Sequence, residues 1–428
     1  MISTHGFVAA VPPLGAADTG GQVVYVLELS KSLSRLGFDV DIWTRRFEDQ
    51  EEIEEVSDHA RIIRAECGGP SFIPKERLFP HMGEWARNAL AFIKDNALSY
   101  SLIDSHYWDA GAAGTILHKA LGAAHMHTPH SLGIWKKRQM EIDFPGDSRK
   151  LEEVYNFGTR IRTETEIYSA ADVVVATTGQ QHEMLVGEYG LPGEKCRVIS
   201  AGYAEDRFHP VSEDRRREIR RRLGFTGPVV MAVGRLARNK GYDLLIDAFT
   251  HVAARMPGAV LALYAGGAER TPAEQDIYQG LLRRVEERGL KGRVRFGSFI
   301  PDTELADYYR AADVFALSSR YEPFGMTAIE AMACGTPIVV TVHGGLHQAL
   351  EYGAHALYAD PFDEEELGAA LFMVLKHEGL HQRLSRLGAE AARNLFTWTG
   401  VARRVLSAAG LGSTGLETSG LEAAGQSG

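Results

Sequence analysis

Short apolar runs alternate with longer segments of helical periodicity along most of the chain. Runs of strand length lie at residues 102–105, 173–176, 229–233 and 313–317. Such alternation predicts parallel strands with helices on both faces of a sheet, which is the doubly wound α/β class. The chain is expected to cross near Phe208 from a first domain, residues 1–208, to a second domain, residues 209–395.

The two ends of the chain carry different patterns. Residues 1–6 predict the tail of a strand that runs into a loop, so we expect the chain to begin inside its first strand. A last helix is predicted at about 396–410, and it is expected to pack back on the first domain. Residues 411–428 lack an apolar period and predict a disordered tail.

Composition narrows the class of protein. The 428 residues are 45% hydrophobic, yet no apolar run is long enough to span a membrane and no signal-peptide pattern opens the chain. A formal net charge of −10 argues against nucleic acid or an anionic membrane as a partner. The basic run at 215–222 is interpreted as a solvated helical face. Three widely spaced cysteines form no metal or disulfide pattern. We expect a cytoplasmic protein whose anionic ligands need a local basic pocket.

The most informative stretch is residues 318–345. It follows an apolar strand, and Gly325 opens a predicted helix that runs to Met332. In an open α/β sheet, ligands bind at the carboxyl ends of the strands, where a helix N-terminus favours a phosphate. Glu322 lies in the preceding loop and is placed to hold sugar hydroxyls, while Glu330 on the helix is placed to reach a ribose.

Other loops at predicted strand ends also carry polar groups. Gly20 and Gly21 precede a helix expected at 23–36, and such a pair brings backbone amides against a diphosphate. Arg235 and Lys240 follow the strand at 229–233 and are placed to neutralise a diphosphate leaving group.

The first half has similar loops. Two histidine-bearing loops, 106–111 and 127–133, follow successive strands, which is better evidence of a site than a lone histidine. A single long helix expected at 152–170 contains Arg160, whose guanidinium suits a phosphate. Lys75 lies in an irregular segment ahead of a helix at 85–94.

The element from Glu322 to Glu330, together with the turn at Gly344 and Gly345, resembles the donor site of retaining glycosyltransferases of the GT-B type, in the sucrose-phosphate synthase group. The resemblance covers nearly the whole chain and implies two Rossmann-like domains that face each other across a cleft. It implies that four residues are catalytic: His130, Arg235, Lys240 and Glu322. It implies that the donor contacts Gly20, Gly21, Arg235, Lys240, Phe324, Gly325, Met326, Thr327 and Glu330. The implied acceptor contacts are Gln22, Lys75, Tyr107, Asp109 and Arg160.

The resemblance also implies an activity. Residues 133–140, 4–6 and 107–109 are more similar to the mannosylfructose-phosphate synthases of this group than to its sucrose-forming members, which favours GDP-mannose as donor and fructose 6-phosphate as acceptor. UDP-glucose with the same acceptor remains an alternative, as does a non-catalytic sensor of sugar nucleotides. No metal cofactor is expected to be required, although Mg²⁺ is not excluded. The expected partners are small molecules, and the oligomeric state is left open.

Overall fold

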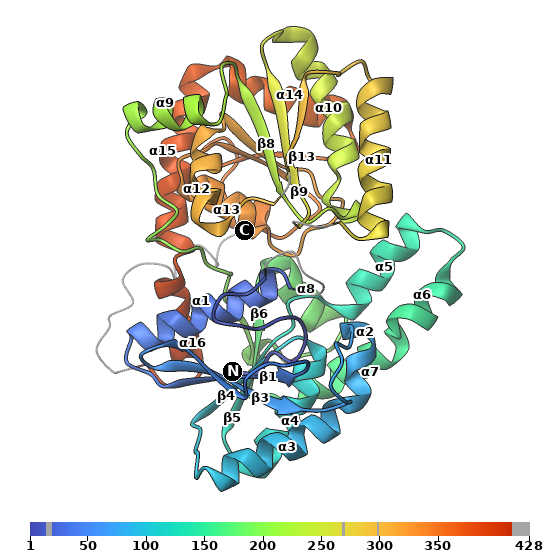
Figure 1. Cartoon of the computed structure of the whole chain (residues 1–428), viewed down its shortest axis with the longest axis vertical. Helices are drawn as coiled ribbons and strands as arrows, with labels where there is room; N and C mark the ends of the chain where they lie inside the picture. The colour runs from blue at the N-terminus through green and yellow to red at the C-terminus, as the bar shows by residue number, and fades with distance from the viewer. Residues whose placement is uncertain (14–18, 268–269, 298, 413–428) are drawn as a thin grey trace.

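The computed structural model describes residues 1–13, 19–267, 270–297 and 299–412. Two α/β domains stack along the long axis of the molecule, the N-terminal domain below and the C-terminal domain above (Figure 1). Nearly all of the predicted tail, residues 413–428, and part of the loop before Gly20 lie outside the described residues. No helix in the described part of the chain is long and apolar enough to cross a membrane.

The N-terminal sheet is completed by the first residues of the chain. Its strand groups have the orders β1-β3-β2 and β4-β5-β6-β7, and Ile2 joins them by parallel bridges to Trp43 and Ser105. The expected strand tail at residues 1–6 therefore lies in the middle of the sheet. The strands are β1 Val40–Arg46, β2 Ile53–Ser57, β3 Ala60–Glu66, β4 Leu102–His106, β5 Ala124–Thr128, β6 Val173–Ala176 and β7 Cys196–Val198.

One strand of this sheet departs from the all-parallel prediction. β2 pairs with β3 in antiparallel orientation at the edge of the sheet. Its side chains are largely exposed and rich in glutamate, so it has no apolar run for the sequence pattern to reveal. The hairpin lies at the far edge from the strands that carry the candidate site.

The C-terminal sheet is parallel throughout its described strands, with the order β10-β9-β8-β11-β12-β13. The chain runs outward from β8 in one direction and from β11 in the other, so the topological switch point lies between these two strands. The strands are β8 Val229–Gly234, β9 Val260–Ala265, β10 Val294–Gly297, β11 Val314–Leu317, β12 Ile338–Thr341 and β13 Leu357–Ala359.

Helices cover both faces of each sheet (Figure 1). In the N-terminal domain they are α1 Gly21–Arg35, α2 Lys75–Leu78, α3 Met82–Asp95, α4 Trp108–Leu121, α5 Gly133–Asp143, α6 Ser148–Tyr155, α7 Phe157–Ala170 and α8 Gly179–Gly187. In the C-terminal domain they are α9 Glu213–Arg222, α10 Tyr242–Arg255, α11 Pro272–Glu287, α12 Asp302–Ala311, α13 Met326–Ala333, α14 Glu364–Lys376 and α15 Glu378–Leu395. The short 3-10 turns are η1 Phe79–His81, η2 Gly193–Lys195, η3 Arg238–Lys240 and η4 Leu346–Ala349.

The single long helix predicted at 152–170 is wrong in one respect, because the segment forms two helices. Asn156 adopts a left-handed conformation with φ of 53°, ends α6 and immediately precedes α7. Asparagine tolerates this conformation better than other side chains that carry a Cβ, so one residue is enough to redirect the chain.

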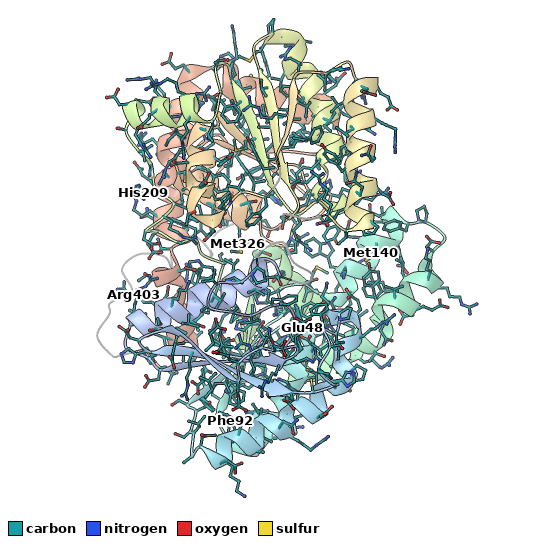
Figure 2. All side chains as sticks on the ribbon, viewed as in Figure 1. Glu48, Phe92, Met140, His209, Met326 and Arg403 are labelled. Atoms are coloured by element: carbon teal, nitrogen blue, oxygen red, sulfur yellow. The ribbon has the colours of Figure 1, made fainter. Side chains whose placement is uncertain are left out.

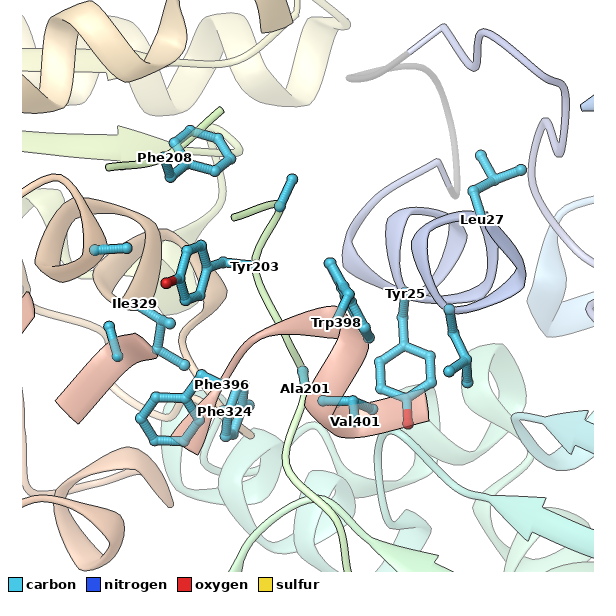
Figure 3. Packing of buried hydrophobic residues seen from close by; sticks show 14 of the residues in the cluster. Tyr25, Leu27, Ala201, Tyr203, Phe208, Phe324, Ile329, Phe396, Trp398 and Val401 are labelled. Carbon is cyan, nitrogen blue, oxygen red and sulfur yellow. The ribbon is translucent and has the colours of Figure 1, made fainter. Parts of the chain in front are cut away.

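The last helix, α16 Trp398–Ala408, leaves the C-terminal domain and packs against α1. Figure 3 shows Trp398 between the two domains, near Tyr25 of α1, with Phe324 and Phe396 on the other side of the same cluster. The ring centres of Tyr25 and Trp398 are 5.0 Å apart. One buried apolar cluster therefore includes residues of both domains and of the returning helix.

The basic run on α9 has a structural role. Arg216 and Arg220 both bind the carboxylate of Asp313, at 2.7 and 2.9 Å. Arg222 pairs with Asp307 on α12 at 2.6 Å. Much of the positive charge of the helix is therefore neutralised within the domain, and part of the face that was expected to be solvated packs against neighbouring carboxylates.

Candidate functional site

A partly buried ion pair lies at the switch point of the C-terminal sheet. The Lys240 ammonium, in η3 after β8, donates to Oε2 of Glu322, in the loop after β11, at 2.6 Å. The Ser319 hydroxyl donates to the same oxygen at 2.9 Å. The two loops are tightly packed, since a Cβ at Gly241 would lie 2.0 Å from the carbonyl oxygen of Ser318. The sequence placed Lys240 and Glu322 in the donor site, and the structure brings them into direct contact.

The N-terminus of α13 lies next to the loop that carries Glu322. Gly325 has a φ of 100°, which favours glycine over residues with a side chain. A Cβ at this position would also lie 2.7 Å from the Leu317 side chain, which is too close. No side chain of the described residues caps this helix, which leaves the first amides, at Met326 and Thr327, to meet an anion. The side chain of Phe324 is buried, 5.9 Å from the ring of Phe396, so it supports the loop from behind.

The glycine loop of the N-terminal domain faces this surface. A Cβ built on Gly20 would lie 3.9 Å from the Arg235 side chain, and one on Gly21 would lie 3.6 Å from Sδ of Met326. Met326 itself lies where the two domains meet (Figure 2). Like α13, α1 has no side-chain cap among the described residues. Two helix N-termini and the exposed Arg235 therefore lie together where the two domains meet, at the position of the cleft that the resemblance implies. The arrangement is suited to a diphosphate.

Glu330 lies one turn deeper on α13. The hydroxyl of Tyr309 donates to its Oε2 at 2.8 Å. Burial raises the pKa of Glu330 to about 7, against the opposing effect of that hydrogen bond. The role of Glu330 as a ribose ligand stays a prediction.

His130 lies on the N-terminal side of the cleft in a strained backbone conformation, with φ of 58°. Its Nε2 is 3.1 Å from Nδ1 of His106, and its ring lies edge-on to Tyr25 with centres 4.8 Å apart. Burial lowers the pKa of His130 well below its ordinary value, with neighbouring histidines adding to the effect. The imidazole is therefore neutral at neutral pH.

The predicted acceptor residues are held by contacts within the N-terminal domain. The Gln22 amide donates to the Ser3 hydroxyl and to the carbonyl oxygen of His106, both at 3.2 Å. Asp109 is fully buried and lies 3.1 Å from Nδ1 of His5. These contacts tie α1, the end of β4 and the start of α4 to the segment that follows Ile2.

Arg160 is the most heavily engaged of the predicted acceptor residues. Its guanidinium donates to Glu164 at 2.8 Å, to the Tyr107 hydroxyl at 3.0 Å and to the Ser131 carbonyl oxygen at 2.6 Å. It is 2% exposed, so most of its hydrogen-bonding capacity is used inside the protein. Its role as a phosphate ligand stays a prediction.

Lys75 begins α2 and is partly buried, 3.3 Å from the carboxylate of Glu76. Burial raises the pKa of the Tyr107 phenol, while the positive charges of Arg160 and Lys75 act in the opposite direction. The two predicted phosphate ligands therefore lie close enough to Tyr107 to influence the same group, although they are far apart in the sequence.

Several residues of the site escaped the sequence reasoning. Tyr309 and Glu164 are single polar residues on helices, with no motif around them to mark their function. The contacts across the cleft were also missed: the ring of Trp135 lies 6.0 Å from Tyr321, and Arg238 stands over Phe144 at 5.2 Å. Only Trp135 had a usable signal, because it falls in the stretch 133–140 that distinguished branches of the family.

The described residues contain no group of three His, Cys, Asp or Glu side chains placed to hold a metal ion.

Comparison with known proteins covers both domains. The family model for Glycosyltransferase Family 4 matches residues 19–207, and that for Glycosyl transferases group 1 matches residues 215–391. Mannosylfructose-phosphate synthase of Agrobacterium fabrum is 57% identical over 95% of this chain and 90% of its own. D-inositol 3-phosphate glycosyltransferase of Corynebacterium jeikeium is 33% identical over 94% of each chain.

A solved structure agrees with these matches. Sucrose-phosphate synthase from Thermosynechococcus elongatus superposes with a TM-score of 0.82 at 32% identity, over 95% of this chain and 96% of the other. The protein is a glycosyltransferase of the GT-B fold and belongs to the family 4 group that includes mannosylfructose-phosphate synthase and sucrose-phosphate synthase.

Proposed function

We propose that this protein transfers the mannosyl group of GDP-mannose to fructose 6-phosphate, giving mannosylfructose phosphate and GDP. The observation that supports this choice is the 57% identity to mannosylfructose-phosphate synthase, which extends over 95% of this chain and so includes both sides of the cleft. The sucrose-phosphate synthase structure shares the fold at a lower identity of 32%. That likeness favours UDP-glucose as the second candidate donor.

Hexosyl transfer requires stabilisation of the charge that develops on the departing diphosphate. Arg235, Lys240 and the free amides at Met326 and Thr327 converge on the cleft from the C-terminal domain. The amides at the start of α1 approach from the opposite side. Because Lys240 and the helix amides are held by the fold before the substrate arrives, they stabilise the leaving group with little reorganisation during the reaction.

The transfer is proposed to retain the configuration of the anomeric carbon. The acceptor hydroxyl attacks on the face from which the diphosphate leaves. A bond forms between the acceptor oxygen and the anomeric carbon as the carbon–oxygen bond to the diphosphate breaks. The hydroxyl proton passes to the departing phosphate oxygen, so atoms and charge balance without another reactant. Closure of the domains excludes water, which would otherwise hydrolyse the donor.

Three side chains are assigned to the donor itself. Glu322, anchored by Lys240 and Ser319, accepts hydrogen bonds from sugar hydroxyls. Glu330 reaches the ribose, and the neutral His130 lies beside the reactive carbon. The positive charges and amides around the diphosphate take the place that a metal ion has in other transferases. We therefore propose that no metal is required, and expect EDTA to leave turnover unchanged while added Mg²⁺ has only a small effect.

A substrate matrix tests the proposal. Purified protein is incubated with GDP-mannose, UDP-glucose, GDP-glucose or ADP-glucose, each with fructose 6-phosphate or fructose, and nucleotide release and product mass are followed. Release only with GDP-mannose and the phosphorylated acceptor supports the proposal. Turnover with UDP-glucose instead identifies a sucrose-phosphate synthase. Tight binding of a sugar nucleotide without turnover of any pair would favour the non-catalytic sensor.

A further inference from the structure

We infer that Asp104 and His106 hold His130 in a single tautomer, with its proton on Nε2 and the lone pair of Nδ1 left for the substrate. His130 would then meet the donor sugar as a hydrogen-bond acceptor, so it would bind a hydroxyl hydrogen and not an oxyanion. The inference rests on the proposed function only in taking the ligand of His130 to be a sugar. The proton arrangement follows from the protein alone.

The three residues form a line that ends at the cleft. Asp104 and His106 are two positions apart on β4, so their side chains leave the same face of the strand. Oδ2 of Asp104 lies 3.3 Å from Nε2 of His106, and Nδ1 of His106 lies 3.1 Å from Nε2 of His130. Asp104 is 4% exposed and His106 is fully buried, so water does not supply alternative partners.

The carboxylate decides where the proton on His106 resides. An ionised carboxylate only accepts hydrogen bonds, and a neutral imidazole has one N–H and one lone pair. Nε2 of His106 makes no aligned hydrogen bond to the described residues, so the carboxylate 3.3 Å away sets its protonation through charge. A lone pair on Nε2 would lie unfavourably beside that negative charge. The proton therefore belongs on Nε2, which leaves Nδ1 of His106 as an acceptor. Nε2 of His130, 3.1 Å away, must then be the donor.

Neighbouring residues hold the backbone and the ring of His130 in place. Its left-handed backbone, with φ of 58°, sets the direction of the side chain. The Gln181 amide lies 3.5 Å from its carbonyl oxygen, and Tyr25 packs edge-on against its ring. The other titratable groups whose charge acts on His130 are His127 on β5 and His5 in the loop after Ile2, and His127 has a pKa lowered well below its ordinary value by burial.

Asp104→Asn tests the arrangement with little change of shape. The substitution removes the negative charge that holds the His106 proton on Nε2. With its NH2 group turned toward Nε2, the asparagine is expected to move the His106 proton to Nδ1 and so to place the His130 proton on Nδ1. We expect kcat with GDP-mannose to fall ~10- to 100-fold, as for other residues that orient a ligand from behind. The KM for fructose 6-phosphate should change little, because no predicted phosphate ligand is touched.

The direct measurement is ¹⁵N NMR of histidine-labelled protein, in which protonated and unprotonated ring nitrogens have distinct shifts. The His130 signals are assigned by their loss in His130→Gln. Wild type should show a protonated Nε2 and an unprotonated Nδ1 at His130, and Asp104→Asn should show the reverse. His106→Asn keeps an acceptor near the position of Nδ1, so it should retain the wild-type tautomer and more activity than His106→Gln.

Asp172→Asn serves as the matched control. It alters another aspartate of the N-terminal domain, which lies 4.0 Å from Nδ1 of His118 on α4 and accepts a hydrogen bond from the backbone N–H of His125 in β5 at 2.8 Å. It should change neither the His130 signals nor kcat. A protonated Nδ1 on wild-type His130, an imidazolium at His106, or an unchanged tautomer in Asp104→Asn would overturn the inference. The expected tautomers in a protein that turns over no nucleotide sugar would instead disprove the proposed function and leave the inference intact.

Discussion

The proposed donor side and the proposed acceptor side of the cleft obtain their geometry in different ways. On the donor side, Lys240 and Glu322 lie on short loops that directly follow adjacent parallel strands. On the acceptor side, Arg160 and Asp109 are held by partners far along the chain, at Tyr107 and His5. The donor site therefore depends on local motifs at a sheet edge, whereas the acceptor site depends on a buried polar network.

This difference predicts different consequences of mutation. A change on the donor side removes a group that acts on the substrate, so activity should fall more than stability. A change on the acceptor side breaks the network that shapes the domain, so stability should fall at least as much as activity. The variants below test that distinction, from the largest expected effect to the smallest.

Arg160→Met should have the largest effect. It leaves the carboxylate of Glu164, which is 1% exposed, without its cation. Breaking a buried ion pair on one side typically costs about 3–5 kcal/mol. We expect a loss of that size in the free energy of unfolding, measured by urea titration. A stable variant with a raised KM for fructose 6-phosphate would show that Arg160 serves the acceptor phosphate and would contradict the proposed contrast.

Lys240→Met should reduce kcat by ~10²- to 10³-fold, because it removes a preorganised cation from the leaving group and leaves Glu322 unpaired. Lys291→Met, on an exposed loop, is the control and should keep wild-type turnover. The measurement is GDP release at saturating donor. Wild-type turnover in Lys240→Met would remove the lysine from the mechanism and favour the sensor hypothesis.

Gly325→Ala separates backbone strain from crowding at the start of α13. The alanine meets both a φ of 100° and a Cβ contact of 2.7 Å with Leu317. Gly353→Ala is the matched variant, because its φ is 75° but no described atom lies within 4 Å. Strain alone costs roughly 1–2 kcal/mol. Gly325→Ala should lose more stability than Gly353→Ala in thermal unfolding, and it alone should weaken GDP binding.

Arg238→Met tests the contacts that link the domains. Arg238 lies over Phe144 across the cleft, 5.2 Å from the ring centre, whereas Arg255 makes a similar contact with Phe372 inside one domain at 5.6 Å. A cation–π contact at such sites contributes ~0.5–1 kcal/mol. Loss of this contact in Arg238→Met should raise the KM for the donor a few-fold. Arg255→Met should lower stability slightly and leave the KM unchanged.

Glu330 should give the smallest effect, which is a dependence of the free energy of unfolding on pH. Its pKa is about 7 in the folded protein, above the ordinary value of 4.5. Between those values the folded state binds more protons than the unfolded state, so this group makes stability fall as pH rises from 4.5 to 7. Glu330→Gln should flatten that part of the stability curve.

The same ionisation should affect the ligand in the opposite direction. An ionised carboxylate accepts hydrogen bonds from ribose hydroxyls with both oxygens. The affinity for GDP should therefore rise a few-fold between pH 6 and 8 in the wild type, as measured by calorimetry. An equal rise in Glu330→Gln would assign the dependence to another group.

The sequence alone determined the α/β class, because parallel strands buried on both faces appear as continuous apolar runs. The family was indicated by a resemblance that the motif residues carry, chiefly those from Glu322 to Gly345. It also indicated the candidate donor residues, since Lys240, Glu322 and Gly325 lie within a few residues of a strand end. It did not reveal the antiparallel strand β2, whose exposed, glutamate-rich residues carry no apolar signal, or the break at Asn156, which depends on one left-handed residue.

Only the tertiary structure decided how the distant polar residues combine. Asp104, His106 and His130 come together because β4 and the loop after β5 are neighbours in the sheet, and Arg160 reaches Tyr107 because α7 packs over α4. The sequence contains these residues but does not indicate which of them form hydrogen bonds with one another. A proton position or a buried ion pair is determined by distances of a few ångströms between separate elements, and those distances arise only when the domains are packed.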